Sequence, residues 1–248
     1  MSAPGLQVLY EDGRLLVVNK PAGLVCHPTR GDETSSLIGR VRLHLGSADG
    51  RLVNRLDRET SGVVLVAKDG PAAGALGKLL ASGACRKDYW AVVHGHVTPG
   101  ALSIDAPLGK DDASTVAIKD AVRAGGAPAR TDVAVDRRFT REGRPFTLVT
   151  VRPHTGRKHQ IRIHLAHAGH PVVGDKIYGD DDQRYLRFVT RALTDDDRRA
   201  LMTEHHLLHA RSLAFAWDGR EWTFTADPGP VMRAWIDDVP PETAPHED

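Results

Sequence analysis

Short turns, rather than helices, join most of the strand-forming runs in this chain of 248 residues. The run "LQVLY" is followed by the turn signal Asp12-Gly13 and then by "RLLVVNK", which predicts a β-hairpin. Two later pairs repeat this arrangement: "RTDVAVDRRF" with "RPFTLVTVRP", and "HLLHARSLAFAW" with "EWTFTA". Strands joined by such turns pair antiparallel, and no alternation of strands with crossover helices is visible. We therefore predict an α+β fold, with a mixed, mostly antiparallel sheet and flanking helices.

Helical patterns occur between and after these runs. Leu37, Val41 and Leu45 recur every four residues, which predicts a helix over residues 35–46. Asp69 has the chemistry of an N-cap, and Gly83 is typical of the residue that ends a helix. Three more helices are expected in "RKHQIRIHLAHAG", in "LTDDDRRALMTEH" with Thr194 as its N-cap, and in "PVMRAWIDDV". We expect one domain over 1–248, with its core at about 6–226 and an acidic tail at 236–248.

The composition is that of a globular protein, with 41% hydrophobic and 26% charged residues. No apolar run approaches the ~18 residues needed to span a membrane. The N-terminus lacks the basic start and apolar core of a signal peptide. Cys26 and Cys85 form no CxxC pair, so we expect two reduced cysteines in a cytoplasmic protein.

Charge is unevenly distributed although the formal net charge is only +1. No acidic residue occurs between Glu142 and Asp175, an interval that contains five arginines and lysines and five histidines. A basic segment in a neutral chain indicates either a polyanion-binding face or an ordinary solvated surface. If the first interpretation holds, residues 144–162 should border one basic groove together with Arg55.

The familiar cofactor motifs are missing from the sequence. Neither GxGxxG nor GxxxxGK[ST] occurs, and GxSxG is also missing. His164, His167 and His170 are three residues apart, but they lack the cysteine or carboxylate partners of most zinc sites. We therefore expect no metal site and no cofactor.

The stretch "NRLDRETSG", residues 54–62, places Asp57 among arginines directly before the apolar run "VVLVAK". Charges beside a buried strand are costly unless they are paired or used. By itself, Asp57 is compatible with a turn residue that caps its own backbone.

Four ordered blocks change that interpretation. They are "GRLLVVNKPAGLVCHP", "NRLDRETSGVVLVAK", "RKDYWAVVHGHV" and "TGRKHQIRIHLAHAGHPVVGDKIYG". In this order the chain closely resembles the RluA family of pseudouridine synthases, from about Leu6 to about Ala226. The family histidine of the second block is replaced by Asn54, which weakens any role that needs an imidazole there. The resemblance covers the catalytic domain only, and we expect no separate N-terminal RNA-binding domain.

The resemblance implies that the protein isomerises uridine to pseudouridine in RNA without a cofactor. It implies that Asp57 is the catalytic carboxylate, acting as a nucleophile or as a base. It implies that Arg162 pairs with this carboxylate, and that Tyr89 stacks on the uracil and is the candidate base at C5. Each of these residues also has a structural alternative, as a surface arginine of a helix or as a packed aromatic of a strand.

The remaining contacts implied by the resemblance are with RNA. Arg55 matches the arginine that enters the stack in place of the extruded base. Arg157, Lys158 and His159 suit backbone phosphates. The partner is expected to be ribosomal or transfer RNA, bound by a monomer. Residues 109–129, which are polar with a β-prone island at Val116–Ile118, are predicted to form a flexible hairpin-like arm that closes on RNA, and the loop at 27–36 to share in target choice.

Two other functions remain open from the sequence. One is a catalytically inactive RNA-binding protein of the same fold. The other is a cofactor-free hydrolase that acts through Asp57 and would release free uracil.

Overall fold

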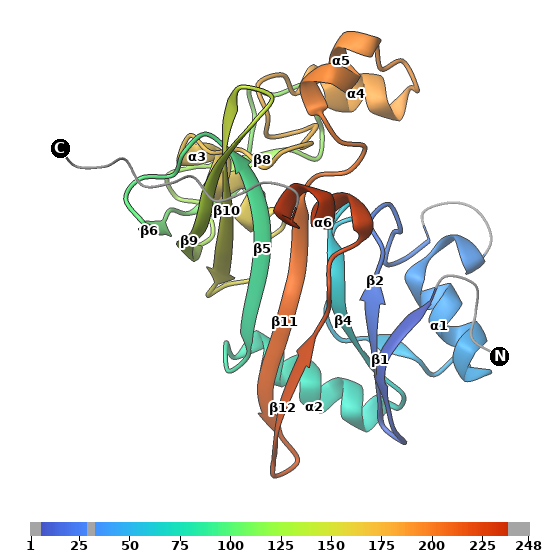
Figure 1. Ribbon diagram of the computed structural model, residues 1–248. Helices are drawn as coiled ribbons and strands as arrows, with labels where there is room; N and C mark the ends of the chain where they lie inside the picture. The colour runs from blue at the N-terminus through green and yellow to red at the C-terminus, as the bar shows by residue number, and fades with distance from the viewer. Residues whose placement is uncertain (1–5, 29–32, 238–248) are drawn as a thin grey trace. The chain divides into compact units, whose positions relative to one another are not determined.

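The computed structural model describes residues 6–28 and 33–237, and within it the chain forms two compact units (Figure 1). The first unit contains residues 1–89 and 209–229, and the second contains residues 90–208 and 230–248. The boundary falls between Tyr89 and Trp90, within a single strand. The expectation of one domain over 1–248 stays a prediction, and so does the single basic groove bordered by residues 144–162 and Arg55.

The first unit is built around a mixed sheet in the strand order β1-β2-β4-β11, with β12 paired to β11 and β3 paired to β4. Pairing is antiparallel except between β4 and β11, which run parallel. The mixed, mostly antiparallel sheet predicted from the sequence is confirmed. The strands are β1 (Gln7–Glu11), β2 (Leu15–Lys20), β3 (Arg51–Leu52), β4 (Ser61–Ala67), β11 (Leu208–Trp217) and β12 (Arg220–Thr225).

Both faces of β2 and β4 are buried, which explains why these strands are continuous apolar runs rather than alternating ones. Leu16 and Val18 face the helix α1 (Leu37–Leu45), which follows the short 3-10 turn η1 (Glu33–Ser35). Leu15 and Val17 face the other side, where the helix α2 (Gly70–Ala81) packs. Successive residues of a strand point to opposite faces, so two helices on opposite faces need apolar residues at every position.

The helix ends of the first unit follow the predicted chemistry. The Ser36 side chain accepts a hydrogen bond from the Gly39 amide at the start of α1. Asp69 accepts one from the Ala72 amide at the start of α2 at 2.6 Å, which confirms its role as N-cap.

The second unit contains the strand order β5-β10-β9-β6 and a separate two-stranded ribbon of β7 and β8. The predicted hairpin of β9 with β10 is confirmed, and its turn places Glu142 and Gly143 at positive φ. This is the backbone that a two-residue hairpin turn requires. The strands are β5 (Arg86–His94), β6 (Ala101–Asp105), β7 (Leu108–Lys110), β8 (Asp120–Val122), β9 (Arg130–Arg141) and β10 (Arg144–Pro153).

Four helices belong to the second unit, and the sequence predicted three of them. These are α3 (Gln160–His167), α5 (Asp195–Leu201) and α6 (Pro230–Asp237). Thr194 begins α5 in a capping box with Asp197, as its sequence indicated. The sequence did not reveal α4 (Gln183–Val189), because this helix has no buried residue and therefore no apolar periodicity.

The excursion at 109–129 differs from its prediction. Its β-prone island is not a strand, because the Lys119 amide donates to the Val116 carbonyl and closes a turn there. The strands lie on either side of it, and the hairpin-like form is confirmed. The excursion also packs against the rest of the second unit, since Val116 is fully buried and Val122 packs on the cluster around Ile163. Of the predicted acidic tail, residues 238–248 lie outside the described part of the chain, as do residues 29–32 of the loop at 27–36.

Gly62 provides a test of how the first unit is held together. It lies in β4 at φ 116°, and an added Cβ would come within 2.6 Å of the Ala210 amide nitrogen in β11. We expect Gly62→Ala to lower the free energy of unfolding by about 2–4 kcal/mol, because both the backbone conformation and the close approach exclude a side chain. Denaturant unfolding measures this change.

Gly74→Ala is the matched control. Gly74 lies in the exposed middle of α2, and nothing lies within 4 Å of an added Cβ. The same substitution there should raise the free energy of unfolding by about 0.5–1 kcal/mol. Equal changes in the free energy of unfolding for the two substitutions would show that the approach of β4 to β11 does not exclude a side chain at residue 62.

Candidate active site

The predicted site residues are divided between the two units. Asp57, Arg55 and Tyr89 belong to the first unit. Arg157, Lys158, His159 and Arg162 belong to the second unit.

Asp57 lies in the loop between β3 and β4, and its side chain is half-buried. The neighbouring Leu56 is buried and exchanges hydrogen bonds of 3.4 Å with the Cys26 thiol through both its amide and its carbonyl. The Asp57 carbonyl accepts from the Thr60 amide at 3.2 Å, and Thr60 is also buried. The loop is therefore anchored on both sides of the aspartate, which limits how far its carboxylate can move.

Lys20 is the strongest anchor of this loop. Its ammonium group is fully buried and donates to three carbonyls: Pro21 at 2.9 Å, Leu24 at 2.8 Å and Arg58 at 3.0 Å. An ammonium group has three donors, and these bonds use all of them. Burial lowers the pKa of Lys20 to about 8, although the negative charge of Asp57 nearby acts in the opposite direction. The sequence marked the "NKP" block, but only the fold places this cation beside the Asp57 loop.

Asn54 replaces the family histidine, and the structure gives it a clear structural role. Its amide nitrogen donates to the Val63 carbonyl at 3.2 Å, and its amide oxygen accepts from the Leu65 amide at 2.7 Å. A carboxamide can donate and accept at the same time, and the edge of β4 presents one carbonyl and one amide to it here. Asn54 therefore ties the start of the loop to the strand that follows it.

Ser61 and His209 tie the end of the loop to β11. The His209 ring is fully buried, and its Nε2 lies 2.9 Å from the Ala226 carbonyl, which can only accept. Nδ1 is then the acceptor of the ring, so the Ser61 hydroxyl donates to it at 2.9 Å. No sequence pattern marked this pair, because residues 61 and 209 become neighbours only through the parallel pairing of β4 with β11.

Tyr89 packs its ring against the cluster of β2, β4 and α1 that also borders the Asp57 loop. Burial raises the pKa of the Tyr89 hydroxyl, and the Asp57 carboxylate raises it further. Tyr89 is therefore a neutral phenol at physiological pH. The structure thus brings Asp57 and Tyr89 together in the first unit, whereas the side chain of Arg55 is exposed.

Arg162 occupies a different environment in the second unit. Its guanidinium makes a bidentate pair with Asp175, with Nε at 2.6 Å and a terminal nitrogen at 2.8 Å, and both side chains are buried. Burial alone would raise the pKa of Asp175, but the Arg162 charge holds it well below its usual range. The Ile177 and Tyr178 amides also donate to the Asp175 carboxylate, and the guanidinium lies 5.0 Å from the Tyr178 ring centre.

The predicted phosphate contacts have protein partners in this structure. Lys158 pairs with Asp120 at 2.8 Å, and the Arg157 Nε donates to the Pro128 carbonyl at 3.1 Å. The side chains of both residues are exposed. His159 is half-buried, and its Nδ1 is hydrogen-bonded at 2.9 Å to the Tyr178 hydroxyl, which also accepts from the Asp120 amide. Asp120, from another part of the chain, thus neutralises part of the positive charge of the interval between Glu142 and Asp175.

The histidines considered as metal ligands have other roles. Both ring nitrogens of the buried His164 are hydrogen-bonded, to the Thr131 hydroxyl and to the Ala106 carbonyl. His170 Nδ1 lies 3.0 Å from the His94 carbonyl. Over residues 6–28 and 33–237, no three side chains of histidine, cysteine, aspartate or glutamate form a group that could hold a metal ion. No helix in these ranges is long and apolar enough to cross a membrane.

Comparison with known proteins matches residues 14–167 to the family described as RNA pseudouridylate synthase. The chain is 38% identical over 181 residues to the "Uncharacterized RNA pseudouridine synthase YlyB" of Bacillus subtilis, covering 70% of this chain and 58% of that protein. It is 37% identical over 212 residues to the "Ribosomal large subunit pseudouridine synthase C" of Escherichia coli, covering 86% of this chain and 62% of that protein. The chain thus spans about three fifths of the length of these relatives.

A solved structure shares the fold. The "Human RNA Pseudouridylate Synthase Domain Containing 1" superposes with a TM-score of 0.75 and 26% sequence identity, covering 98% of this chain and 91% of that one. The predicted fold class and the family resemblance are confirmed by these matches.

The Arg162–Asp175 pair gives a direct test of the second unit. We expect Asp175→Asn to lower the free energy of unfolding by about 3–5 kcal/mol, because it leaves a buried guanidinium charge without its carboxylate. Asp195→Asn is the control, since Asp195 is 88% exposed and lies 4.0 Å from Arg198. That change should cost less than about 0.5 kcal/mol. Similar costs for the two variants in denaturant unfolding would contradict the role given to the buried pair.

Proposed function

Because the chain belongs to the RNA pseudouridylate synthase family, we propose that it isomerises uridine to pseudouridine in RNA with Asp57 as the catalytic carboxylate. The observation that carries this proposal is the half-buried Asp57 in a loop that the buried Lys20 ammonium anchors, beside the neutral phenol of Tyr89.

The reaction breaks the N1–C1′ bond of the uridine and forms a bond between C5 and C1′. The hydrogen lost from C5 is balanced by one gained at N1, so the product has the same atoms as the substrate. No electrons enter or leave, and the protein must supply only a carboxylate, proton transfer and orientation. Asp57 acts either as a nucleophile at the sugar or as a base that removes a sugar proton.

The first unit supplies the immediate surroundings of that carboxylate. The Lys20 charge favours the ionised form of a nearby carboxylate, which both roles of Asp57 require. The Tyr89 ring offers an aromatic surface for the uracil. Because its pKa is raised, Tyr89 must first lose its own proton before it can accept one from C5.

We also assign Arg162 as the partner of Asp57 and Arg55 as the residue that fills the stack left by the extruded base. Asp175 uses Nε and one terminal nitrogen of Arg162, and a guanidinium has five N–H donors in all. Binding to a second carboxylate is therefore compatible with the buried pair. Arg157, Lys158 and His159 are assigned to backbone phosphates.

The substrate that we propose is ribosomal large-subunit RNA, modified in the cytoplasm by a monomer. The support is the Escherichia coli relative, whose name describes it as a pseudouridine synthase of the ribosomal large subunit. A pseudouridine map of cellular RNA, made with and without this protein, tests the target. Modified positions in transfer RNA alone would overturn the ribosomal assignment and leave the reaction in place.

We predict that Asp57→Asn abolishes pseudouridine formation, with a loss of at least about a thousandfold, while the fold and RNA binding stay intact. An amide has the shape of the carboxylate, but it is a poor nucleophile and does not accept a proton as a carboxylate does. The measurement is pseudouridine formed on an RNA that the wild type modifies, together with assays for free uracil. Free uracil from the wild type would indicate a hydrolase instead.

Asp69→Asn is the matched control for this substitution. Asp69 caps α2, and asparagine caps helices about as well as aspartate does, so activity should remain at the wild-type level. Activity in Asp57→Asn close to that of Asp69→Asn would remove Asp57 from catalysis.

The pKa of Lys20 predicts a pH dependence. The pKa is lowered to about 8, so the buried ammonium loses its proton above that pH, and with it one donor and the charge near Asp57. We expect the rate to fall about tenfold per pH unit above pH 8, as protonated Lys20 becomes the minor form. A rate that stays constant to pH 10 would contradict this.

Unfolding provides the control for this pH prediction. The unfolded chain keeps its lysine proton up to pH ~10.4, so between pH 8 and that value it binds more protons at this site than the folded chain. The contribution of Lys20 to stability therefore rises with pH in this window. Loss of activity without loss of thermal stability distinguishes titration of the site from unfolding.

A further inference from the structure

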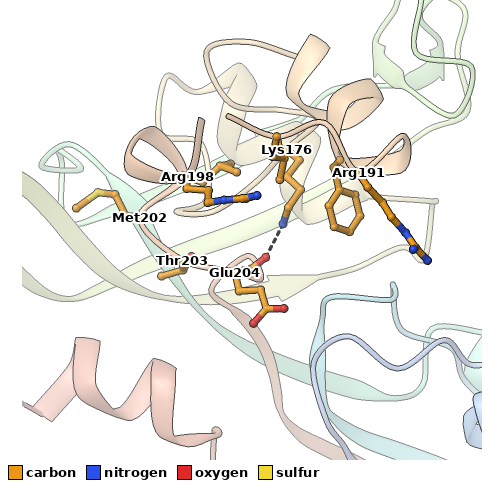
Figure 2. Close-up of a pocket in the computed structure, with 9 residues that line it drawn as sticks. Lys176, Arg191, Arg198, Met202, Thr203 and Glu204 are labelled. Atoms are coloured by element: carbon orange, nitrogen blue, oxygen red, sulfur yellow. Dashed lines mark hydrogen bonds between the residues drawn. The ribbon is translucent and has the colours of Figure 1, made fainter. Parts of the chain in front are cut away.

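A pocket of about 530 Å³ lies within the second unit and contains none of the residues assigned above (Figure 2). Its wall is formed by the end of α4, by α5 and by the segment that follows α5, while Lys176 closes one side. The lining combines cations with apolar side chains. The residues that matter here are Lys176, Phe188, Arg191, Arg198, Met202 and Glu204.

The pocket wall is fixed by a half-buried ion pair. The Arg187 guanidinium of α4 makes a bidentate contact with Asp197 of α5, at 2.8 and 2.7 Å, and a further contact of 2.7 Å with Asp181. Asp197 is buried and also closes the capping box of α5. Figure 1 shows α4 and α5 side by side, as this pair requires. The pocket is therefore formed before any ligand arrives, which reduces the entropic cost of binding.

Lys176 brings a positive charge to the pocket. Its side chain is buried, and its ammonium donates to the Glu204 carbonyl at 2.6 Å and lies 4.8 Å from the centre of the Phe188 ring. Figure 2 shows Arg198 extending toward Lys176, whereas the Glu204 carboxylate is directed away from it. Lys176 and Arg198 thus bring their charges to one side of the pocket, where Glu204 offers its carbonyl, whereas the Arg191 guanidinium extends away from them.

Two backbone positions indicate that the side chains of this pocket are used. Arg191 follows α4 at φ 59°, and Met202 ends α5 at φ 63°. Glycine is the usual residue where a helix ends in this conformation, because other residues have a cost of roughly 1–2 kcal/mol there. Both side chains line the pocket. Strain of this kind commonly marks functional sites.

We propose that this pocket is a second RNA-binding site, which receives one nucleotide of the substrate RNA outside the catalytic centre. Phe188, partly exposed, and Met202 offer apolar surface to a nucleobase, and stacking on aromatic side chains is tolerant of sequence. Lys176 and Arg198 match the charge of the attached phosphate, and Arg191 offers a cation to a neighbouring phosphate. The volume is sufficient for one nucleotide but not for a duplex. The proposal rests on the proposed function, because RNA is the ligand.

The test compares adjacent arginines of α5. Arg198 lines the pocket and Arg199 does not, although their side chains are 59% and 72% exposed and each pairs with an aspartate three residues earlier. The probe is an unmodified transcript of large-subunit ribosomal RNA, and the readout is its dissociation constant at constant salt. We expect Arg198→Ala to weaken binding roughly tenfold and Arg199→Ala by less than about twofold. Equal weakening would show a general charge effect and overturn the pocket.

Arg191→Gly is an independent test, in which the affinity for RNA should fall although thermal stability does not. Glycine suits the backbone at that position, so the melting temperature should stay the same or rise. RNA binding should weaken roughly fivefold, because a phosphate contact is lost. Wild-type affinity in this variant would contradict the proposal even if Arg198→Ala weakens binding.

A third arm distinguishes RNA from a free nucleotide, which has the same chemistry. The probe is adenosine monophosphate, titrated into the wild type and into Arg198→Ala. Suppose that adenosine monophosphate binds the wild type but not Arg198→Ala, and that the two proteins bind the transcript equally. The pocket is then a site for a free nucleotide, and the RNA proposal fails. Pseudouridine formation on the same transcript is measured in parallel. Binding without isomerisation by the wild type would refute the proposed function and leave the pocket result independent of it.

Discussion

The arrangement of the candidate catalytic loop depends on how its backbone polar groups are satisfied. A loop that enters a sheet with two covered faces has carbonyl and amide groups that water cannot reach easily. Three side chains supply the missing partners: the Lys20 ammonium, the Cys26 thiol and the Asn54 amide. All three lie outside the loop's central residues. Asp57 is consequently positioned by contacts to the backbone of its neighbours, which limits where its carboxylate can lie.

The second unit uses a buried charge pair for a similar purpose. Arg162 comes from α3, and Asp175 comes from the segment that follows this helix. The pair gathers the Ile177 and Tyr178 amides around one carboxylate, and the Tyr178 hydroxyl in turn is hydrogen-bonded to His159. A buried pair is costly to desolvate and is weak evidence for stability alone. The pair instead fixes the position of Arg162, because its guanidinium and the two amides all donate to the same Asp175 carboxylate.

Charge pairs also explain an element that the sequence concealed. Helix α4 buries no side chain completely, so it lacks the apolar periodicity by which helices are recognised. It is held by Arg187 and Arg184, which bind aspartates of α5 and of the preceding loop. The same contacts form the wall of the cationic pocket. Likewise, the acid-free interval predicted a basic surface, yet Lys158 and Arg162 find acids from outside it.

The sequence by itself determined the hairpins, most of the helices and the identity of Asp57 as the residue to examine. These depend on local properties: turn chemistry at Asp12-Gly13, capping at Asp69 and Thr194, and the order of motifs along the chain. Only the tertiary structure decided what surrounds those residues. Lys20 and Arg58, or Ser61 and His209, are far apart in sequence and meet because strands pair across long intervals. Partners of this kind leave no periodic trace in a single sequence, since hydrogen bonding and burial depend on contacts that exist only after the chain has folded.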